Sequence, residues 1–342
     1  MKFLKGLLSL IILAIVVGGA AAGVGWIWMQ DALNRDGPLT EDVVFRVEQG
    51  EGLNSVAARL ETDEIIRDAK LIRLKAKLEK TETDIKAGEF KIERGASMVE
   101  VLHTLIEGKG VLYKITLPEG RTTAQLLKVI EADPVLVGDM PEGEIPEGSL
   151  LPDTYLFDRG MTRSDLIQLM QDKQAELLDE LWPQRDPDIP VETPYEAVIL
   201  ASVVEKETGL VEEQPEIAAL FTTRLKRGMR LESDPTIIYG VSRGEPLYNA
   251  RGQRRTLRRS EIDTKTDWNT YQIDGLPKTP ICNPGRGAIE AVLNPPHTEY
   301  IFFVADGKGG HLFAKTLAEH NRNVAAYRAY ERKEIARERA AE

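Results

Sequence analysis

The sequence has little of what metal and redox chemistry require. Its 342 residues include one cysteine, Cys282, and four histidines. A single cysteine excludes an intrachain disulfide, and without a second thiol Cys282 is expected to be an ordinary packing or loop residue. His297, His311 and His320 do not have the spacing of HExxH or of another common zinc motif. We therefore expect no metal site and no cofactor.

Two further absences limit the function. Neither a G-x-S-x-G elbow nor a P-loop occurs, which removes two large classes of enzyme. The formal net charge is −11, whereas binding of nucleic acid requires a positive surface, so nucleic acid is not an expected partner. What the chain does have is length, since 342 residues suffice for two or three domains with cores of their own.

The N-terminus carries the longest uncharged run. Two lysines precede it, and no charged residue occurs from Gly6 to Gln30, which is long enough to cross a bilayer as a helix. The lysines orient the N-terminus toward the cytoplasm, and two tryptophans near the end of the run suit an interfacial belt. A cleaved signal peptide is the alternative, but the apolar run continues past the small residues where cleavage would occur. We expect residues 1–30 to be an uncleaved anchor, followed by a linker over 31–42.

Three segments share the order strand, turn glycine, helix. They cover residues 45–60, 90–105 and 113–130, and a charged amphipathic helix is expected between the first two. Two interpretations stay open: three ordinary β-turn-α units, or a small module that grips an extended ligand.

The rest of the chain reads as a helix-rich region. A Pro/Gly/Glu-rich connector over 138–149 is followed by a helical stretch over 162–181. Near the C-terminus, an apolar strand over 300–304 is followed by a glycine turn and then by a second strand or helix. We expect an α+β fold, with a small mixed module near the membrane and a larger helix-rich domain that contains a short sheet.

Residues 193–209 give the strongest chemical signal. Thr193 begins a helix with a T-x-x-E capping box, and Gly209 ends it. At 100° per residue, Glu207 falls within the apolar stripe of this helix and Glu205 lies on its edge. A carboxyl group in apolar surroundings keeps its proton to higher pH and can act as a general acid. The alternative is that Glu207, in the last turn, extends into water.

Polar clusters elsewhere could complete a site. Glu232 and Asp234 precede a short β-like run that ends at Tyr239. The loop over 267–285 combines amides and hydroxyls with aromatic faces, as sugar-binding clefts do, although its Asn and Gly could merely satisfy turn geometry. The arginine run over 251–260 could meet substrate carboxylates, but a solvated loop is the preferred interpretation.

Five blocks together resemble one known family. The chain is similar to the YceG-like family, the endolytic murein transglycosylases, over nearly its whole length and in the expected order. The blocks are EGSLLPDTYLF (147–157), LASVVEKETG (200–209), RLKRGMRLESDPTIIYG (224–240), NTYQIDGLPKTPICNPG (269–285) and YIFFVADGKGGHLFAKTLAEHN (300–321). The arginine-rich loop Arg251–Arg259 looks like a local elaboration, from which nothing about catalysis is inferred.

The resemblance implies an organisation and a location. Members of the family are inner-membrane proteins that cut the glycan strands of peptidoglycan internally, and cutting nascent strands would end their elongation. It implies a LysM-like subdomain over 43–110, a connecting α/β region over 111–192, a catalytic domain over 193–330 and a charged tail over 331–342. The catalytic domain would lie in the periplasm, with peptidoglycan synthases as candidate partners.

The resemblance also implies a mechanism, with Glu207 as the essential acid. Glu207 would protonate the oxygen between N-acetylmuramic acid and N-acetylglucosamine, and the muramyl 6-hydroxyl would attack C1 to give a 1,6-anhydro end. Because an intramolecular nucleophile has a high effective molarity, one buried acid and a sugar-shaped cleft suffice. We expect substrate-binding or acid-orienting roles for Asn269, Thr270, Tyr271 and Tyr239. Supporting roles are expected for Glu205, Glu232 and Asp234.

Two other functions stay open. A non-catalytic peptidoglycan-binding scaffold would bind wall material without releasing fragments. A hydrolytic muramidase would use Asp234 as a second carboxylate and would produce reducing ends instead of anhydro ends.

Overall fold

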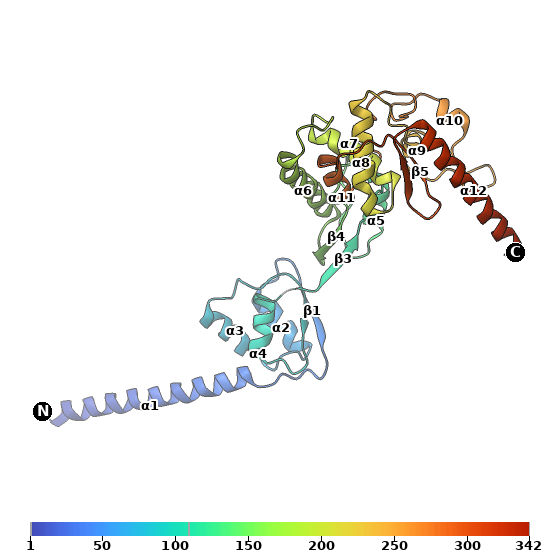
Figure 1. Cartoon of the computed structure of the whole chain (residues 1–342). Helices are drawn as coiled ribbons and strands as arrows, with labels where there is room; N and C mark the ends of the chain where they lie inside the picture. Colours follow the sequence, from blue (N-terminus) through green and yellow to red (C-terminus); the bar gives the residue numbers. More distant parts are fainter. Residues whose placement is uncertain (1, 109, 342) are drawn as a thin grey trace. The chain divides into compact units, whose positions relative to one another are not determined.

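The computed structural model describes residues 2–108 and 110–341. The chain divides into two compact units. The first unit contains Met1–Tyr113 and Leu156–Gly160, and the second contains Lys114–Tyr155 and Met161–Glu342. The chain passes between the units within the paired strands β3 (Leu112–Thr116) and β4 (Thr154–Asp158), which Figure 1 labels.

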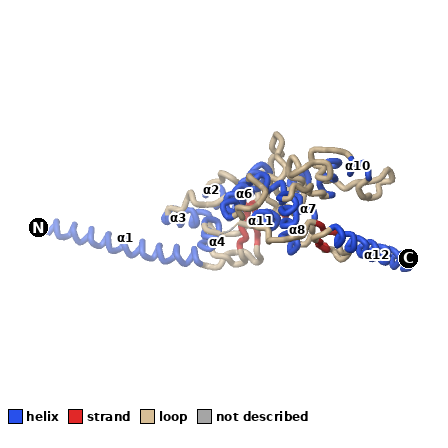
Figure 2. The backbone as a smooth tube through the Cα atoms, turned by 45° about the horizontal axis from the view of Figure 1, so that its top comes forward, coloured by secondary structure: helices blue, strands red, loops and turns tan. Residues whose placement is uncertain are grey.

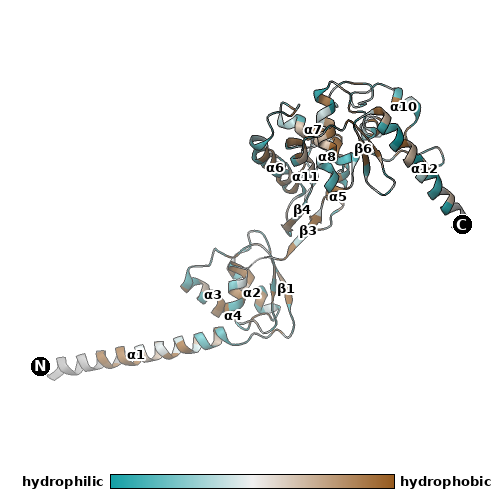
Figure 3. Ribbon diagram, viewed as in Figure 1, coloured by the Kyte–Doolittle hydropathy of each residue, from teal (hydrophilic) through white to brown (hydrophobic). Residues whose placement is uncertain are grey.

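A single helix, α1 (Lys2–Asn34), begins the chain. Near its C-terminal end, Met29 and Leu33 are buried in the core of the first unit. Its exposed large apolar residues are Ile12, Leu13, Ile15, Val16, Val17, Val24, Trp26, Ile27 and Trp28. Figure 3 shows hydrophobic segments, coloured brown, along α1. Within the part of the chain that the structure describes, no helix combines the length and the apolar character needed to cross a membrane. The side chains of residues 1–11 and 14 lie outside that part, so the predicted anchor stays a prediction.

The first unit is a β–α–α–β arrangement followed by a further helix. Strand β1 (Val43–Val47) pairs antiparallel with β2 (Gly88–Ile92), and Phe45 lies opposite Phe90. The two helices between the strands are α2 (Leu53–Thr62) and α3 (Ala69–Glu79), and α4 (Met98–Ile106) follows. Each strand turns alternate residues toward the helices, so one face of the sheet is buried and the other, which carries Val44 and three charged residues, is more exposed.

The regular structure of the second unit is mostly helical, and long loops join the helices, as Figure 2 shows. Its α-helices are α5 (Thr123–Ala132), α6 (Arg163–Leu181), α7 (Pro194–Glu207), α8 (Gln214–Lys226), α9 (Asp234–Ser242), α10 (Arg259–Asp263), α11 (Arg286–Leu293) and α12 (Leu317–Ala341). Short 3₁₀ turns span Trp182–Gln184 and Val211–Glu213. Strands β5 (Phe302–Ala305) and β6 (His311–Ala314) form an antiparallel pair. Helices α7, α8 and α11 pack together around the buried Phe221.

The predicted α+β class is confirmed, with one local correction. The three strand–turn–helix segments form, and the stretch predicted to be helical over 162–181 is α6. The β-like run predicted to end at Tyr239 is wrong, because these residues form α9. Helix α9 begins with Asp234 and with a proline in its first turn, and it buries Thr236, Ile237 and Tyr239. Residues 114–155 and 161–192, predicted to connect the domains, belong to the second unit.

Candidate active site

Glu207 lies at the C-terminal end of α7, a helix that is largely buried. The Thr193 side chain accepts a hydrogen bond from the Glu196 amide and caps the helix, and proline occupies its first position. The eight consecutive residues from 197 to 204 are all buried, so α7 runs through the core. Glu207 is the last helical residue and Thr208 is the C-cap. The predicted capping box is half formed, because the Glu196 carboxylate accepts from the Glu192 amide.

Glu207 faces a cavity of about 630 Å³, which we call the acid cavity. Its lining residues are Glu207, Arg224, Glu232, Asp234, Tyr271, Phe302, Phe303, Val304, Ala305, His311, Leu317, His320 and Val324. Although the residue as a whole is only partly buried, Oε1 is fully enclosed and has no hydrogen-bond partner among the described residues. Burial raises the pKa of Glu207 to about 7; the charge of Asp234 adds to the shift, whereas the Ser233 hydroxyl and Arg224 oppose it. The group is therefore suited to donate a proton near neutral pH.

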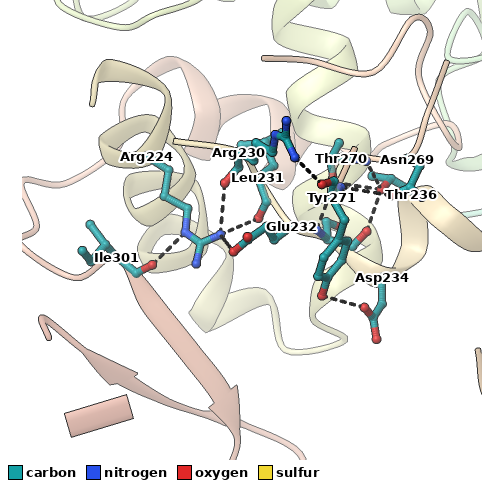
Figure 4. A network of polar contacts seen from close by, with 11 residues as sticks. Arg224, Arg230, Leu231, Glu232, Asp234, Thr236, Asn269, Thr270, Tyr271 and Ile301 are labelled. Carbon is teal, nitrogen blue, oxygen red and sulfur yellow. Dashed lines mark hydrogen bonds and ion pairs between the residues drawn. The ribbon is translucent and has the colours of Figure 1, made fainter. Parts of the chain in front are cut away.

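Arg224 holds one wall of the acid cavity in place. Its Nη1 lies 3.1 Å from the Arg230 carbonyl oxygen, 2.8 Å from that of Leu231 and 3.1 Å from Oε2 of Glu232, and its Nε donates to the Ile301 carbonyl at 2.7 Å (Figure 4). A buried guanidinium needs partners for its donors, and here backbone carbonyls and one carboxylate accept from Nε and Nη1. Arg224 thereby connects residues 230–232, which precede α9, to Ile301, which precedes β5.

Asp234 and Tyr271 form a second polar pair in the acid cavity. The Tyr271 hydroxyl donates to Oδ1 of Asp234 at 2.8 Å (Figure 4). Burial and the neighbouring Asp234 raise the pKa of the Tyr271 hydroxyl, which therefore keeps its proton and the hydrogen bond. Glu232, at φ 52°, has a left-handed backbone conformation and also reaches the cavity. Two of the three predicted supporting carboxyls, Glu232 and Asp234, thus share the acid cavity with Glu207.

Asn269 and Thr270 are placed differently from a lining role. Both are fully buried, and neither lines the acid cavity. The Asn269 amide donates to the carbonyls of residues 261, 262 and 264, and its oxygen accepts from the Tyr271 amide. The Thr270 hydroxyl accepts from the Ser233 amide at 3.0 Å. Because both side chains are enclosed, the prediction that they contact the substrate is wrong. The predicted role in orienting the acid is compatible with their positions, since Ser233 is a neighbour of Glu207.

Tyr239 and Glu205 lie away from the acid cavity. The Tyr239 hydroxyl donates to Oε2 of Glu147 at 3.0 Å, and its ring packs edge-on against Trp268. Oε2 of Glu205 accepts from the Gly285 amide at 3.2 Å and from Gln214 at 3.4 Å. Burial raises the pKa of Glu205 as well, although these donors oppose the shift. Because its carboxylate is held by donors of the surrounding loops, Glu205 is less suited than Glu207 to release a proton to a ligand.

One polar pair, of which only His311 lines the acid cavity, has no counterpart in the sequence-based prediction. Nδ1 of His311 lies 2.8 Å from Oε2 of Glu213, whose other oxygen accepts from the His311 amide at 2.8 Å. Burial alone would raise the pKa of Glu213, but the hydrogen bonds from His311 leave it lowered. The two residues are 98 positions apart, and no motif spacing links them. The structure therefore adds His311 to the polar groups that face the cavity.

Comparison with known proteins gives one family. Residues 45–326 match the model of the YceG-like family. The chain is 26% identical to an endolytic murein transglycosylase of Bacillus subtilis over 330 residues, which cover 87% of each chain. It is 26% identical to an endolytic murein transglycosylase of Streptococcus pneumoniae, covering 93% of this chain and 64% of that protein. The crystal structure of a yceG-like protein from Listeria monocytogenes is 25% identical and covers 82% of this chain and 98% of that one, with a TM-score of 0.49.

Proposed function

Because the chain belongs to the YceG-like family, we propose that it is a lytic transglycosylase that cuts peptidoglycan glycan strands internally. The names of the relatives from Bacillus subtilis and Streptococcus pneumoniae support this activity. One structural observation supports the choice of acid: Oε1 of Glu207 is enclosed without a partner among the described residues, and burial beside the acid cavity raises the pKa of the carboxyl to about 7. A general acid for glycosidic cleavage needs this combination.

The proposed reaction uses one carboxyl group in two steps. Glu207 gives its proton to the oxygen that joins C1 of N-acetylmuramic acid to N-acetylglucosamine, and the C1–O bond breaks. The muramyl 6-hydroxyl oxygen then forms a bond to C1, and its proton returns to the Glu207 carboxylate. Asp234 and Glu232, which line the same cavity, stabilise the positive charge that develops at C1. The product ends in a 1,6-anhydro ring.

This assignment explains why a single enclosed acid is enough. A hydrolase must also position and activate a water, which normally requires a second carboxylate across the scissile bond. The 6-hydroxyl belongs to the substrate and reacts within one molecule, so the protein has only to hold the sugar in a reactive conformation. The aromatic and polar lining of the acid cavity suits that task.

Mass spectrometry of digested glycan strands tests the proposal. We expect anhydro ends from the wild-type protein and a loss of at least about 10³-fold in rate for Glu207→Gln, because a carboxamide is far too weak an acid to protonate the leaving oxygen. Glu205→Gln is the matched control, and it should keep most of its activity because Glu205 does not line the cavity. Reducing ends would show that the protein is a hydrolytic muramidase. Full activity of Glu207→Gln would show that Glu207 is not the general acid.

We also propose that the chain is a single-pass inner-membrane protein with its N-terminus in the cytoplasm. The uncharged run from Gly6 to Gln30 supports an anchor, and the β–α–α–β order of Val43–Ile92 supports a LysM-like first unit. Contact with peptidoglycan synthases stays a prediction from the resemblance. Protease accessibility in spheroplasts tests the orientation: only a catalytic unit outside the cytoplasmic membrane would be cut without lysis.

A further inference from the structure

A second cavity, of about 390 Å³, shares Asp234 with the acid cavity. We call it the loop cavity. Its walls are the exposed side of α9 and part of the arginine-rich loop. The lining residues are Lys206, Asp234, Pro235, Ile238, Tyr239, Gly244, Glu245, Pro246, Leu247, Arg254, Arg255, Thr256, Leu257 and Ile281. Lys206, which directly precedes Glu207, reaches this second cavity. A ligand held at Glu207 therefore has a second recess beside it.

One arginine of the loop holds the loop together. Both terminal nitrogens of Arg255 contact the Glu261 carboxylate, at 2.8 and 2.6 Å, and its Nε donates to the Tyr248 carbonyl. The hydrogen bond from Arg255 lowers the pKa of Glu261 to about 2, so this pair stays charged at any physiological pH. Because the pair is neutral as a whole and largely buried, Arg255 is a structural residue and not a free cation.

Two other cations in the loop cavity are not neutralised. Within the described residues, the exposed Arg254 side chain has neither an ion pair nor a hydrogen bond. The Lys206 ammonium donates to the Gly120 carbonyl at 3.1 Å. Among the residues that the structure describes, no carboxylate lies within ion-pair distance of it. Of the acids, Glu245 lies 3.4 Å from Lys128, and Asp234 accepts from Tyr271. Asp234 has no cation within ion-pair distance among the described residues, so the two unpaired cations of the cavity outnumber its one unpaired acid. In a chain with a net charge of −11, this local excess of positive charge makes the cavity a site for an anion.

From this arrangement we propose that the loop cavity binds a carboxylate of the peptide attached to the sugar next to the scissile bond. The proposal rests on the proposed function, in which the substrate is a peptidoglycan strand. The sugar rings of that strand are uncharged, whereas the peptide attached to the muramyl lactyl group carries carboxylates. A guanidinium binds a carboxylate through two parallel hydrogen bonds, and Lys206 adds a second positive charge. The protein therefore distinguishes strands that carry peptides from bare strands.

The test measures binding and does not require cleavage. Full-length Glu207→Gln protein is titrated with glycan strands that carry peptides and with the same strands after an amidase has removed the peptides. The lactyl carboxylates that the amidase exposes are first converted to methyl amides, so that the comparison strand carries no carboxylate at these positions. We expect the peptide-bearing strands to bind about tenfold more tightly, since one charge-assisted contact has roughly this effect. Adding Arg254→Gln should reduce this ratio about fivefold or more, and Arg254→Lys should restore part of it. Arg251→Gln is the matched control: it removes the same charge from the same loop, but it does not line the cavity.

Each outcome decides the proposal. Equal affinity for both strands, or an Arg254→Gln effect that is the same on both, would show that the cavity does not read the peptide. An equal loss in Arg251→Gln would show a general effect of charge and would also overturn the proposal. The proposed function is tested separately, by anhydro ends from the wild-type protein. If strands bind with the expected ratio but no anhydro ends form, the activity fails and the peptide site stands.

Discussion

The position of Glu207 at the end of α7 disfavours its charged form for two reasons. Oε1 is enclosed without a partner among the described residues, so the carboxylate would lose its hydration. The residue is also the last of its helix, where the carbonyl end of the macrodipole is negative. An aspartate or glutamate at the other end of a helix would be stabilised as an anion. The same side chain at this end holds its proton, and that makes it a candidate acid.

The rate should follow the protonation of this one group. Since the acid must carry its proton before the bond breaks, and since the pKa of Glu207 is about 7, kcat/KM should fall about tenfold per pH unit above pH 7. A pH–rate profile on soluble glycan strands measures this. A rate that rises through pH 7 would mean that the active form of the group is the carboxylate, as in a base-assisted hydrolysis.

Protein stability should show the same pKa. The pKa of Glu207 is raised from 4.5 to about 7 in the folded protein, so the folded state binds more protons than the unfolded state between these values. The contribution of Glu207 to the free energy of unfolding is therefore fully present below pH 4.5 and is lost as the pH rises through 7. Allowing for the part of the side chain that stays exposed, the loss is roughly 2 kcal/mol.

The variant Glu207→Gln cannot lose a proton at this position, so its stability relative to wild type should increase from pH 5 to pH 8. Urea unfolding at both pH values measures the difference. The exposed Glu212→Gln serves as control. If the two variants change equally with pH, Glu207 does not have a raised pKa.

At single positions, the sequence could predict what depends on helical periodicity. The enclosure of Glu207 could be predicted from its place within the apolar stripe of α7, although exposure to water was the alternative, and its role as the acid came from the family resemblance. The enclosure of Asn269 and Thr270 could not be predicted, since an amide or hydroxyl in a polar loop can bind a ligand or backbone groups equally well. The pairing of His311 with Glu213 also left no local pattern, because it depends on how β6 meets the turn before α8.

Helix α9 shows how tertiary packing can override local preference. Its sequence, DPTIIYGVS, is rich in β-branched and aromatic residues, which favour strands. The Asp-Pro start suits the first turn of a helix, and the burial of Thr236, Ile237 and Tyr239 selects the helical arrangement. By contrast, α6 and α7 were predicted correctly because two local signals both indicate a helix: a threonine at the N-cap and apolar residues at helical spacing. The start of α9 matters for the site, since it carries Asp234.

Thr270→Val should disturb the start of α9 without unfolding the protein. The Thr270 hydroxyl accepts from the Ser233 amide at 3.0 Å and lies 2.9 Å from the Thr236 hydroxyl. Removing it leaves a buried backbone donor without a partner, which costs about 1 to 3 kcal/mol of folding free energy. Because Ser233 adjoins Glu207 and Asp234, kcat should also fall, by about tenfold.

The control for this variant is Thr264→Val, which makes the same substitution at an exposed position. Chemical denaturation and initial rates are measured for both. A Thr270→Val protein that loses stability but keeps the wild-type kcat would show that this hydrogen bond does not position the acid or its neighbours.

The chain forms two units that are not two simple consecutive segments. Residues 156–160 return to the first unit after the chain has entered the second. The sequence indicated the strand at the start of residues 113–130, but neither β4 nor the pairing of β3 with β4, because a helix and a long connector separate them. Pairing of distant strands depends on packing that no local pattern records.

Each unit has its own hydrophobic core, so we expect two unfolding transitions in calorimetry. Leu102 is buried in the core of the first unit and Phe221 in that of the second. Replacing either by alanine removes a large buried side chain and should cost about 3 to 5 kcal/mol of local stability. Leu102→Ala should then lower the temperature of one transition and Phe221→Ala that of the other, each leaving its counterpart in place. Because the acid cavity lies within the second unit, rates on soluble strands should decline at the temperature that Phe221→Ala shifts. A single transition that both substitutions lower would mean that the two cores unfold together, and the activity would then depend on both.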